Sequence, residues 1–213
     1  GGFIAPAYQI SKVCREWAKE RFIVAAPRQA KSAATLIALG ADQVHMGPLS
    51  HLGPVDPQFE WGSGVSMEDS LNSITRRVKE NPSQAVAEMW STYLQGQLPI
   101  GAIGEYERTV IACAQYAERL LISGKSDKSR AERIAQHLVY EYKNHGFVID
   151  SAEAIEIFGD SSVVTSSNEL AFSEDVYRII SKVENQLKGT VDHEQGIMFT
   201  GIDVVGSVED GVD

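Results

Sequence analysis

The stretch that decides the fold is Lys31-Ser-Ala-Ala-Thr-Leu-Ile-Ala-Leu-Gly-Ala-Asp42, which follows a strand-like run from Phe22 to Ala26. Its small apolar residues begin a helical pattern at Ser32. A strand that turns sharply into a helix exposes the first side chain of the helix and leaves the first N–H groups without helical partners. An activated serine with oxyanion donors needs that geometry. Serine is also a preferred helix cap, so Ser32 has two interpretations, a nucleophile or an N-cap.

The residues around this stretch favour an α/β fold. Ile10, Val13, Cys14 and Trp17 fall at helical spacing in the preceding segment. Together the patterns predict a helix over 5–20, a strand over 21–26, a helix over 32–39 that Gly40 stops, and a strand over 43–46. Helices and strands that alternate with tight links are typical of an α/β layer.

After residue 65 the composition becomes helical, and Pro82 and Pro99 interrupt the pattern. We expect helices over 67–80, 83–95, 105–123, 128–144, 151–159 and 170–187, and a turn into a short strand over 146–150. The chain therefore divides into an α/β core with the candidate site (1–65), a helical region (66–145), a late turn-and-helix segment (146–188) and a tail (189–213). We expect the tail to fray or to dock on a partner.

Composition limits the function. The chain has 213 residues, 43% of them hydrophobic, which is enough for one full α/β domain. Its formal net charge is -10, which argues against a nucleic-acid partner because such binding needs clustered Lys and Arg. The one basic cluster, Lys125 to Arg133, alternates with Ser, Asp and Glu and is typical of a solvated helix start.

Two cysteines, Cys14 and Cys113, lie in apolar helical patterns. Buried free thiols are the favoured interpretation and a disulfide the alternative; free thiols favour a reducing, cytoplasmic compartment.

Without CxxC or HxxxH spacing we expect no metal and no cofactor. No apolar run approaches the roughly 20 residues of a membrane span, and no signal segment opens the chain. Because a domain seldom begins Gly-Gly-Phe-Ile, we expect further residues upstream.

The loop from Gly47 to Pro57 is rich in Pro and Gly, and two prolines lie near Asp56. Fixed proline φ values make such a loop stiff. A stiff loop can hold a catalytic partner in one place, and it can equally be a plain edge connection. Both interpretations remain open from the sequence.

Two motifs resemble the serine dehydrogenase proteinase family of the ClpP/crotonase superfamily, which is related to signal peptide peptidase A. The first is Ser32-Ala-Ala-Thr-Leu-Ile-Ala-Leu-Gly-Ala-Asp42 together with Leu52-Gly-Pro-Val-Asp-Pro-Gln58. A looser match is His145-Gly-Phe-Val-Ile-Asp-Ser-Ala-Glu-Ala154. The resemblance covers residues 1–60 and, loosely, 130–160. It implies a ClpP/crotonase-like layered sheet with flanking helices and a helical extension.

The resemblance implies a serine-type peptidase with Ser32 as the nucleophile. The oxyanion would be held by the N–H groups of Gly2, in the Gly-Gly turn, and of Ala33, beside the nucleophile. Glycine suits the first position because a Cβ would crowd the substrate. Each donor would contribute about 3 kcal/mol of transition-state stabilisation.

The general base has several candidates. The loop over 50–57 lies where the resemblance places a partner, and it offers His51 and Asp56. The alternative for His51, which departs from the acid typical of the family, is a surface loop residue; for Asp56 it is a turn cap. Further candidates are Lys79 and Arg76 on a helix, Lys31 beside the nucleophile, and His145 in the looser motif, for which a buried, hydrogen-bonded His is the favoured interpretation. His45 in its strand is expected to be a packing residue.

Two other functions remain open. The chain could be a catalytically inactive ClpP-like scaffold that binds peptides or partner subunits, because Ala34 stands where the family prefers Gly. It could also perform crotonase-like acyl-CoA chemistry, although only Arg28 and Lys31 supply positive charge near Ser32. We expect a peptide or protein substrate, which could be associated with a membrane. The resemblance also implies a homo-oligomer, because members of the superfamily commonly form oligomers.

Overall fold

The computed structural model describes residues 3–59, 62–97, 100–124 and 126–188. It has an α/β fold around a parallel sheet in the order β1–β3–β7. These strands are β1 (Ile23–Ala26), β3 (Gln43–Met46) and β7 (Val163–Val164). Two smaller pairs are parallel β2 (Gln29–Ala30) with β4 (His51–Leu52), and antiparallel β5 (Gln58–Phe59) with β6 (Gly62–Ser63).

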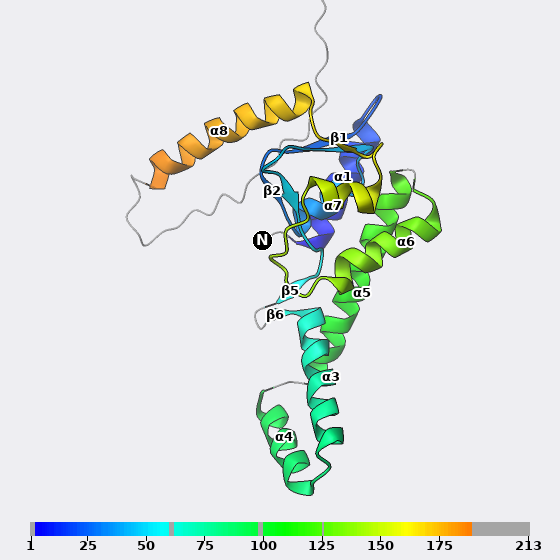
Figure 1. The fold of residues 1–213 in the computed structure, drawn as a ribbon, viewed down its shortest axis with the longest axis vertical. Helices are drawn as coiled ribbons and strands as arrows, with labels where there is room; N and C mark the ends of the chain where they lie inside the picture. The colour runs from blue at the N-terminus through cyan, green and yellow to red at the C-terminus, as the bar shows by residue number, and fades with distance from the viewer. Residues whose placement is uncertain (1–2, 60–61, 98–99, 125, 189–213) are drawn as a thin grey trace, which may run out of the picture.

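Helices surround and extend the sheet (Figure 1). They are α1 (Ile4–Trp17), α2 (Ala33–Ala38), α3 (Gly64–Glu80), α4 (Gln84–Gln97), α5 (Ile100–Ser123), α6 (Lys128–Gln136), α7 (Ser151–Phe158) and α8 (Asn168–Lys188), with a π-helical turn over His137–Glu141. Helices α3 and α4 form a hairpin that projects from one end of the molecule, and α8 extends from the other (Figure 1).

The central strand β3 has a different helix layer on each face. Val44 borders the apolar core together with residues of α2 and α5. The next residue, His45, contacts Ser167 and Glu169 at the start of α8. Because side chains alternate along a strand, α2 and α5 cover one face of the sheet and α8 begins on the other.

Helix α1 packs closely on α2 because small residues meet at their contact. Ser11 is fully buried and donates a hydrogen bond to the carbonyl of Ile37 at 2.8 Å. A Cβ on Gly40 would lie 2.2 Å from Ser11 Oγ. Gly40 therefore permits the contact between these helices, whereas α2 itself ends before it, at Ala38.

The strongly patterned elements agree with the sequence prediction. The strand over 43–46 has the predicted bounds, and α7 ends at Phe158, directly before Gly159, whose φ of 90° favours glycine. The helix predicted over 128–144 is confirmed as far as Glu141, where it ends three residues early, and its last part is a π-helical turn over His137–Glu141. The tail over 189–213 lies outside the described residues.

Both cysteines are free. Cys113 is buried, as predicted, whereas Cys14 is only half-buried. Burial raises the pKa of the Cys113 thiol to about 12, and the nearby charge of Asp56 adds to the effect. That thiol is therefore protonated at neutral pH and is a poor nucleophile.

In the part of the chain that the structure describes, every helix is too short or too polar to cross a bilayer.

Candidate functional site

Ser32 has an unusual backbone conformation. Its φ and ψ are 56° and -114°, and Ala34 N–H donates to the Lys31 carbonyl at 3.1 Å. These values define the second position of a type II′ turn, which normally holds glycine. Among the described residues no other non-glycine has a positive φ. A side chain in such a region costs about 1–3 kcal/mol, a cost that is typically found at functional sites.

Ser32 occupies the N-cap position of α2. Its side chain makes no capping hydrogen bond to α2, although it directly precedes the helix. The residue is half-buried. Ala33 is the first residue of α2, so its N–H has no acceptor within the helix. The hydroxyl and this amide therefore lie next to each other at the same turn.

Asp56 and His145 form a hydrogen-bonded pair. Asp56 Oδ1 lies 2.7 Å from His145 Nδ1, and Asp56 Oδ2 accepts from the Gln58 amide at 2.8 Å. The Asp56 side chain is 7% exposed and that of His145 31%. Because an ionised carboxylate only accepts, His145 Nδ1 is the donor in this bond, and in the neutral imidazole Nε2 is then the acceptor. Within the described part of the chain, His145 Nε2 has no hydrogen-bond partner.

The topology brings Ser32 toward this pair. Ala30 of β2 pairs in parallel with Leu52 of β4, and Leu52 forms an antiparallel bridge with Ile149. Ser32 follows Ala30 and Asp56 follows Leu52, whereas His145 precedes Ile149. Since the segment through Ile149 runs in the opposite direction, all three residues lie beyond the same end of these paired segments.

Three further contacts fix the segments next to Ser32 and His145. Lys31 Nζ donates to the carbonyl of Gly146 at 2.7 Å, which links the residues next to Ser32 and His145. The fully buried Thr35 hydroxyl lies 2.6 Å from the Ala30 carbonyl and 3.0 Å from the Gly53 carbonyl. It also accepts the Gly53 N–H at 3.1 Å. The Thr35 side chain thereby fixes the start of α2 to Ala30, which precedes the helix, and to Gly53, which follows β4.

The other predicted residues lie elsewhere or outside the description. His51 is in β4, paired with Gln29, and its side chain has no hydrogen bond among the described residues. Gly2 lies outside the described residues. Arg76 and Lys79 are on α3, in the projecting hairpin. Asp56 stays a predicted site residue, and the structure pairs its carboxylate with His145 rather than with His51.

The sequence analysis offered His145 as a further base candidate but favoured a buried, hydrogen-bonded histidine. Its position depends on the bridge between Leu52 and Ile149, which the sequence does not reveal. The available signal was the looser motif, in which His145 precedes Gly146 and the strand predicted over 146–150, of which the structure has only the isolated bridge at Ile149. The predicted hydrogen bond of His145 is confirmed, but its side chain is half-exposed rather than buried.

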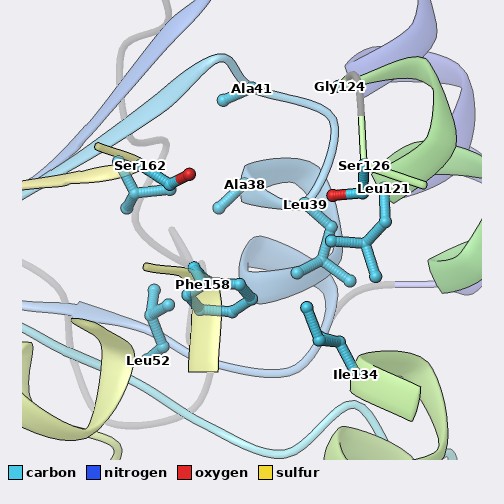
Figure 2. Close-up of a pocket in the computed structure, with 11 residues that line it drawn as sticks. Ala38, Leu39, Ala41, Leu52, Leu121, Gly124, Ser126, Ile134, Phe158 and Ser162 are labelled. Atoms are coloured by element: carbon cyan, nitrogen blue, oxygen red, sulfur yellow. The ribbon is translucent and has the colours of Figure 1, made fainter. Parts of the chain in front are cut away.

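No set of three His, Cys, Asp or Glu residues within the described ranges is grouped to hold a metal ion. A cavity of about 40 Å³ lies between the end of α2 and helices α5, α6 and α7. Figure 2 shows Leu39, Leu121, Ile134 and Phe158 around it. It has room for a few water molecules at most and does not include Ser32, Asp56 or His145.

No protein-family model matches the chain, and no solved structure matches it. It is 43% identical over 157 residues to an uncharacterized protein of Methanocaldococcus jannaschii. The match covers 74% of this chain and 49% of that protein. The chain thus spans about half the length of this curated relative.

Proposed function

We propose that the chain is a serine-type peptidase of the ClpP/crotonase type, with Ser32 as nucleophile, His145 as general base and Asp56 as the residue that orients the base. The observations that carry the proposal are the strained turn at Ser32 and the hydrogen-bonded pair of Asp56 and His145, which the strand pairing puts at the same end of the paired segments. A nucleophile, a base and a group that orients the base are the three parts that acyl transfer needs.

In this mechanism Ser32 Oγ attacks the carbonyl carbon of the substrate while His145 Nε2 takes the hydroxyl proton. Asp56 holds Nδ1–H and stabilises the imidazolium that forms. His145 then gives the proton to the leaving amine, which breaks the peptide bond and leaves an acyl-enzyme on Ser32. Water activated by His145 hydrolyses the ester and restores the serine.

The charge that develops on the carbonyl oxygen needs N–H donors. Ala33 N–H is one candidate because it is the first amide of α2 and lies next to the nucleophile. Gly2 stays the proposed second donor on the resemblance alone.

Free thiols at Cys14 and Cys113 support a reducing compartment, so we propose a cytoplasmic location.

The test is covalent labelling with a fluorophosphonate, which reacts with an activated serine. We expect mass spectrometry to find the probe on Ser32, and labelling to be lost in Ser32→Ala. A matched control is Ser161→Ala, which removes an exposed serine next to β7 and should leave labelling unchanged.

A second pair of variants separates the candidate bases. His145→Ala should abolish labelling, whereas His51→Ala should retain it, although both side chains are half-buried. Folded protein that is never labelled between mildly acidic and basic pH would contradict the peptidase proposal. Peptide binding without turnover, equal before and after Ser32→Ala, would instead favour the inactive scaffold.

A further inference from the structure

Helix α8 has an apolar stripe that the rest of the described chain does not cover. Phe172, Val176, Ile179 and Val183 follow each other at spacings of four, three and four residues. Phe172 is 53% exposed, Ile179 63% and Val183 48%, and Val176 is half-buried. Alternating steps of three and four are the pattern of a coiled-coil seam.

The domain fixes only the first half of α8. Leu170 and Ser173 are buried, and Glu174 forms an ion pair with Arg28, whose guanidinium stacks over the Tyr177 ring at 4.8 Å. The second half of the helix extends away from the sheet (Figure 1). The stripe therefore continues from the body of the protein onto a projecting helix.

The apolar stripe on α8 of one copy matches the stripe on α8 of a second copy when the two helices run in opposite directions. A twofold axis between Tyr177 and Arg178 places Phe172 opposite Val183 of the second copy and Val176 opposite Ile179. Every layer then pairs an apolar residue with another. Antiparallel helix dipoles also oppose each other favourably.

Charge selects the same arrangement. Acidic residues gather in the first half of the helix and basic residues in the second, with one acidic exception. The acidic residues are Glu169, Glu174 and Asp175, the basic ones Arg178, Lys182 and Lys188, and the exception is Glu184. Antiparallel packing puts Asp175 near Lys182 of the second copy, whereas parallel packing would put like charges together. We propose that the chain forms a homodimer by antiparallel packing of α8 against α8 of a second copy.

A contact limited to three turns of helix is smaller than a standard interface, so the dimer should dissociate on dilution, with a dissociation constant of about micromolar order. Sedimentation velocity of the 213-residue chain over a dilution series measures it. Ile179→Glu should leave a monomer at every concentration. Ile111→Glu, on α5, replaces an isoleucine of similar exposure (50%) and should leave the dimer intact.

Charge reversal tests the geometry itself. Asp175→Lys and Lys182→Asp should each weaken the dimer about tenfold, because each introduces two repulsive contacts about the axis. The double variant should restore the original affinity, with circular dichroism checking that the helix is kept. In a background without Cys14, a mixture of Val176→Cys and Ile179→Cys chains should form the mixed disulfide in preference to either symmetric one.

Several results would overturn the proposal. These are a wild-type monomer at all concentrations, a dimer that Ile179→Glu does not affect, or a double charge reversal that fails to restore affinity. If the wild type is monomeric and removal of residues 189–213 makes it dimerise through the stripe, the chain's own last segment is the occupant, which also overturns it.

Discussion

Asp56 Oδ1 lies 2.7 Å from His145 Nδ1, although 89 positions separate the two residues in the chain. The pair is held from both sides. Leu52 and Ile149 exchange backbone hydrogen bonds of 2.9 and 3.2 Å, and Val55 N–H donates to the Leu138 carbonyl at 3.0 Å. The carboxylate is buried and the imidazole is half-exposed, so the buried Asp56 fixes the orientation of the more exposed His145 ring.

Asp56→Asn should reduce activity without unfolding the protein. The amide keeps the volume and can still accept from Gln58, but its NH₂ then faces His145 Nδ1 and forces that nitrogen to accept. Nε2 would carry the proton and could not take one from Ser32. We expect the rate of probe labelling to fall about 10⁴-fold.

The control for that variant is Gln58→Ala, which removes the partner of the other carboxylate oxygen and leaves the histidine tautomer unchanged. It should lower the labelling rate about tenfold at most. If Asp56→Asn keeps more than a small fraction of the wild-type rate, Asp56 does not orient the base.

Ser32→Gly should stabilise the protein while it abolishes labelling. Glycine adopts a φ of 56° without strain, which relieves about 1–3 kcal/mol, offset by about 0.5–1 kcal/mol because glycine makes the unfolded chain more flexible. We expect the free energy of unfolding in urea to rise by about 1 kcal/mol. Ser32→Ala keeps the Cβ and its strain and should show no such gain. Equal stabilities for the Gly and Ala variants would mean that the turn stores no strain.

The sequence predicted the elements whose pattern repeats locally. Helices such as α1 and α5 were found because their apolar periodicity spans several turns, and β1 and β3 because they are continuous buried runs. Strands β2 and β4 were not found, because each has two residues and exists only through its long-range partner.

The site was predicted in part for the same reason. Ser32 and Asp56 lie in one contiguous stretch with a specific motif, so both could be named. His145 joins them only through the pairing of Leu52 with Ile149, a contact between distant segments that local patterns do not encode. The backbone strain at Ser32 was equally hidden, since serine is not a residue that normally marks a type II′ turn.

Gly53→Ala should disrupt the link between the two sides of the site. A Cβ at this position would lie 2.8 Å from Lys31 Cγ and 3.1 Å from Lys31 Cβ. These atoms lie near the backbone and cannot easily move, so Lys31 should lose its hydrogen bond to Gly146. We expect a loss of about 1–3 kcal/mol in the free energy of unfolding and slower labelling of Ser32.

Gly101→Ala is the matched control, because it lies in α5 with no atom within 4 Å of the added Cβ. Because Gly101 is in the first turn of α5 and the propensity difference applies to a helix interior, the substitution should stabilise the protein by at most about 1 kcal/mol. A second variant, Lys31→Met, keeps the aliphatic stem and removes only the hydrogen bond. If Gly53→Ala is as stable and as reactive as the wild type, the Lys31 contact does not support the site.

His45 should make the protein less stable in mild acid. Burial lowers the pKa of its imidazole; Glu169 opposes this shift and Arg21 adds to it. Its Nδ1 lies 2.7 Å from Ser167 Oγ, and its buried Nε2 has no partner within the described residues. Below a pH of about 6.5 the unfolded chain therefore binds a proton that the native His45 resists. The free energy of unfolding should decrease as the pH falls from 6.5 toward the lower native pKa.

His45→Asn keeps a polar group near Ser167 and removes the titration, so urea unfolding between pH 5 and 8 should give it the shallower profile. Parallel profiles for the two proteins would show that His45 does not contribute to the acid sensitivity.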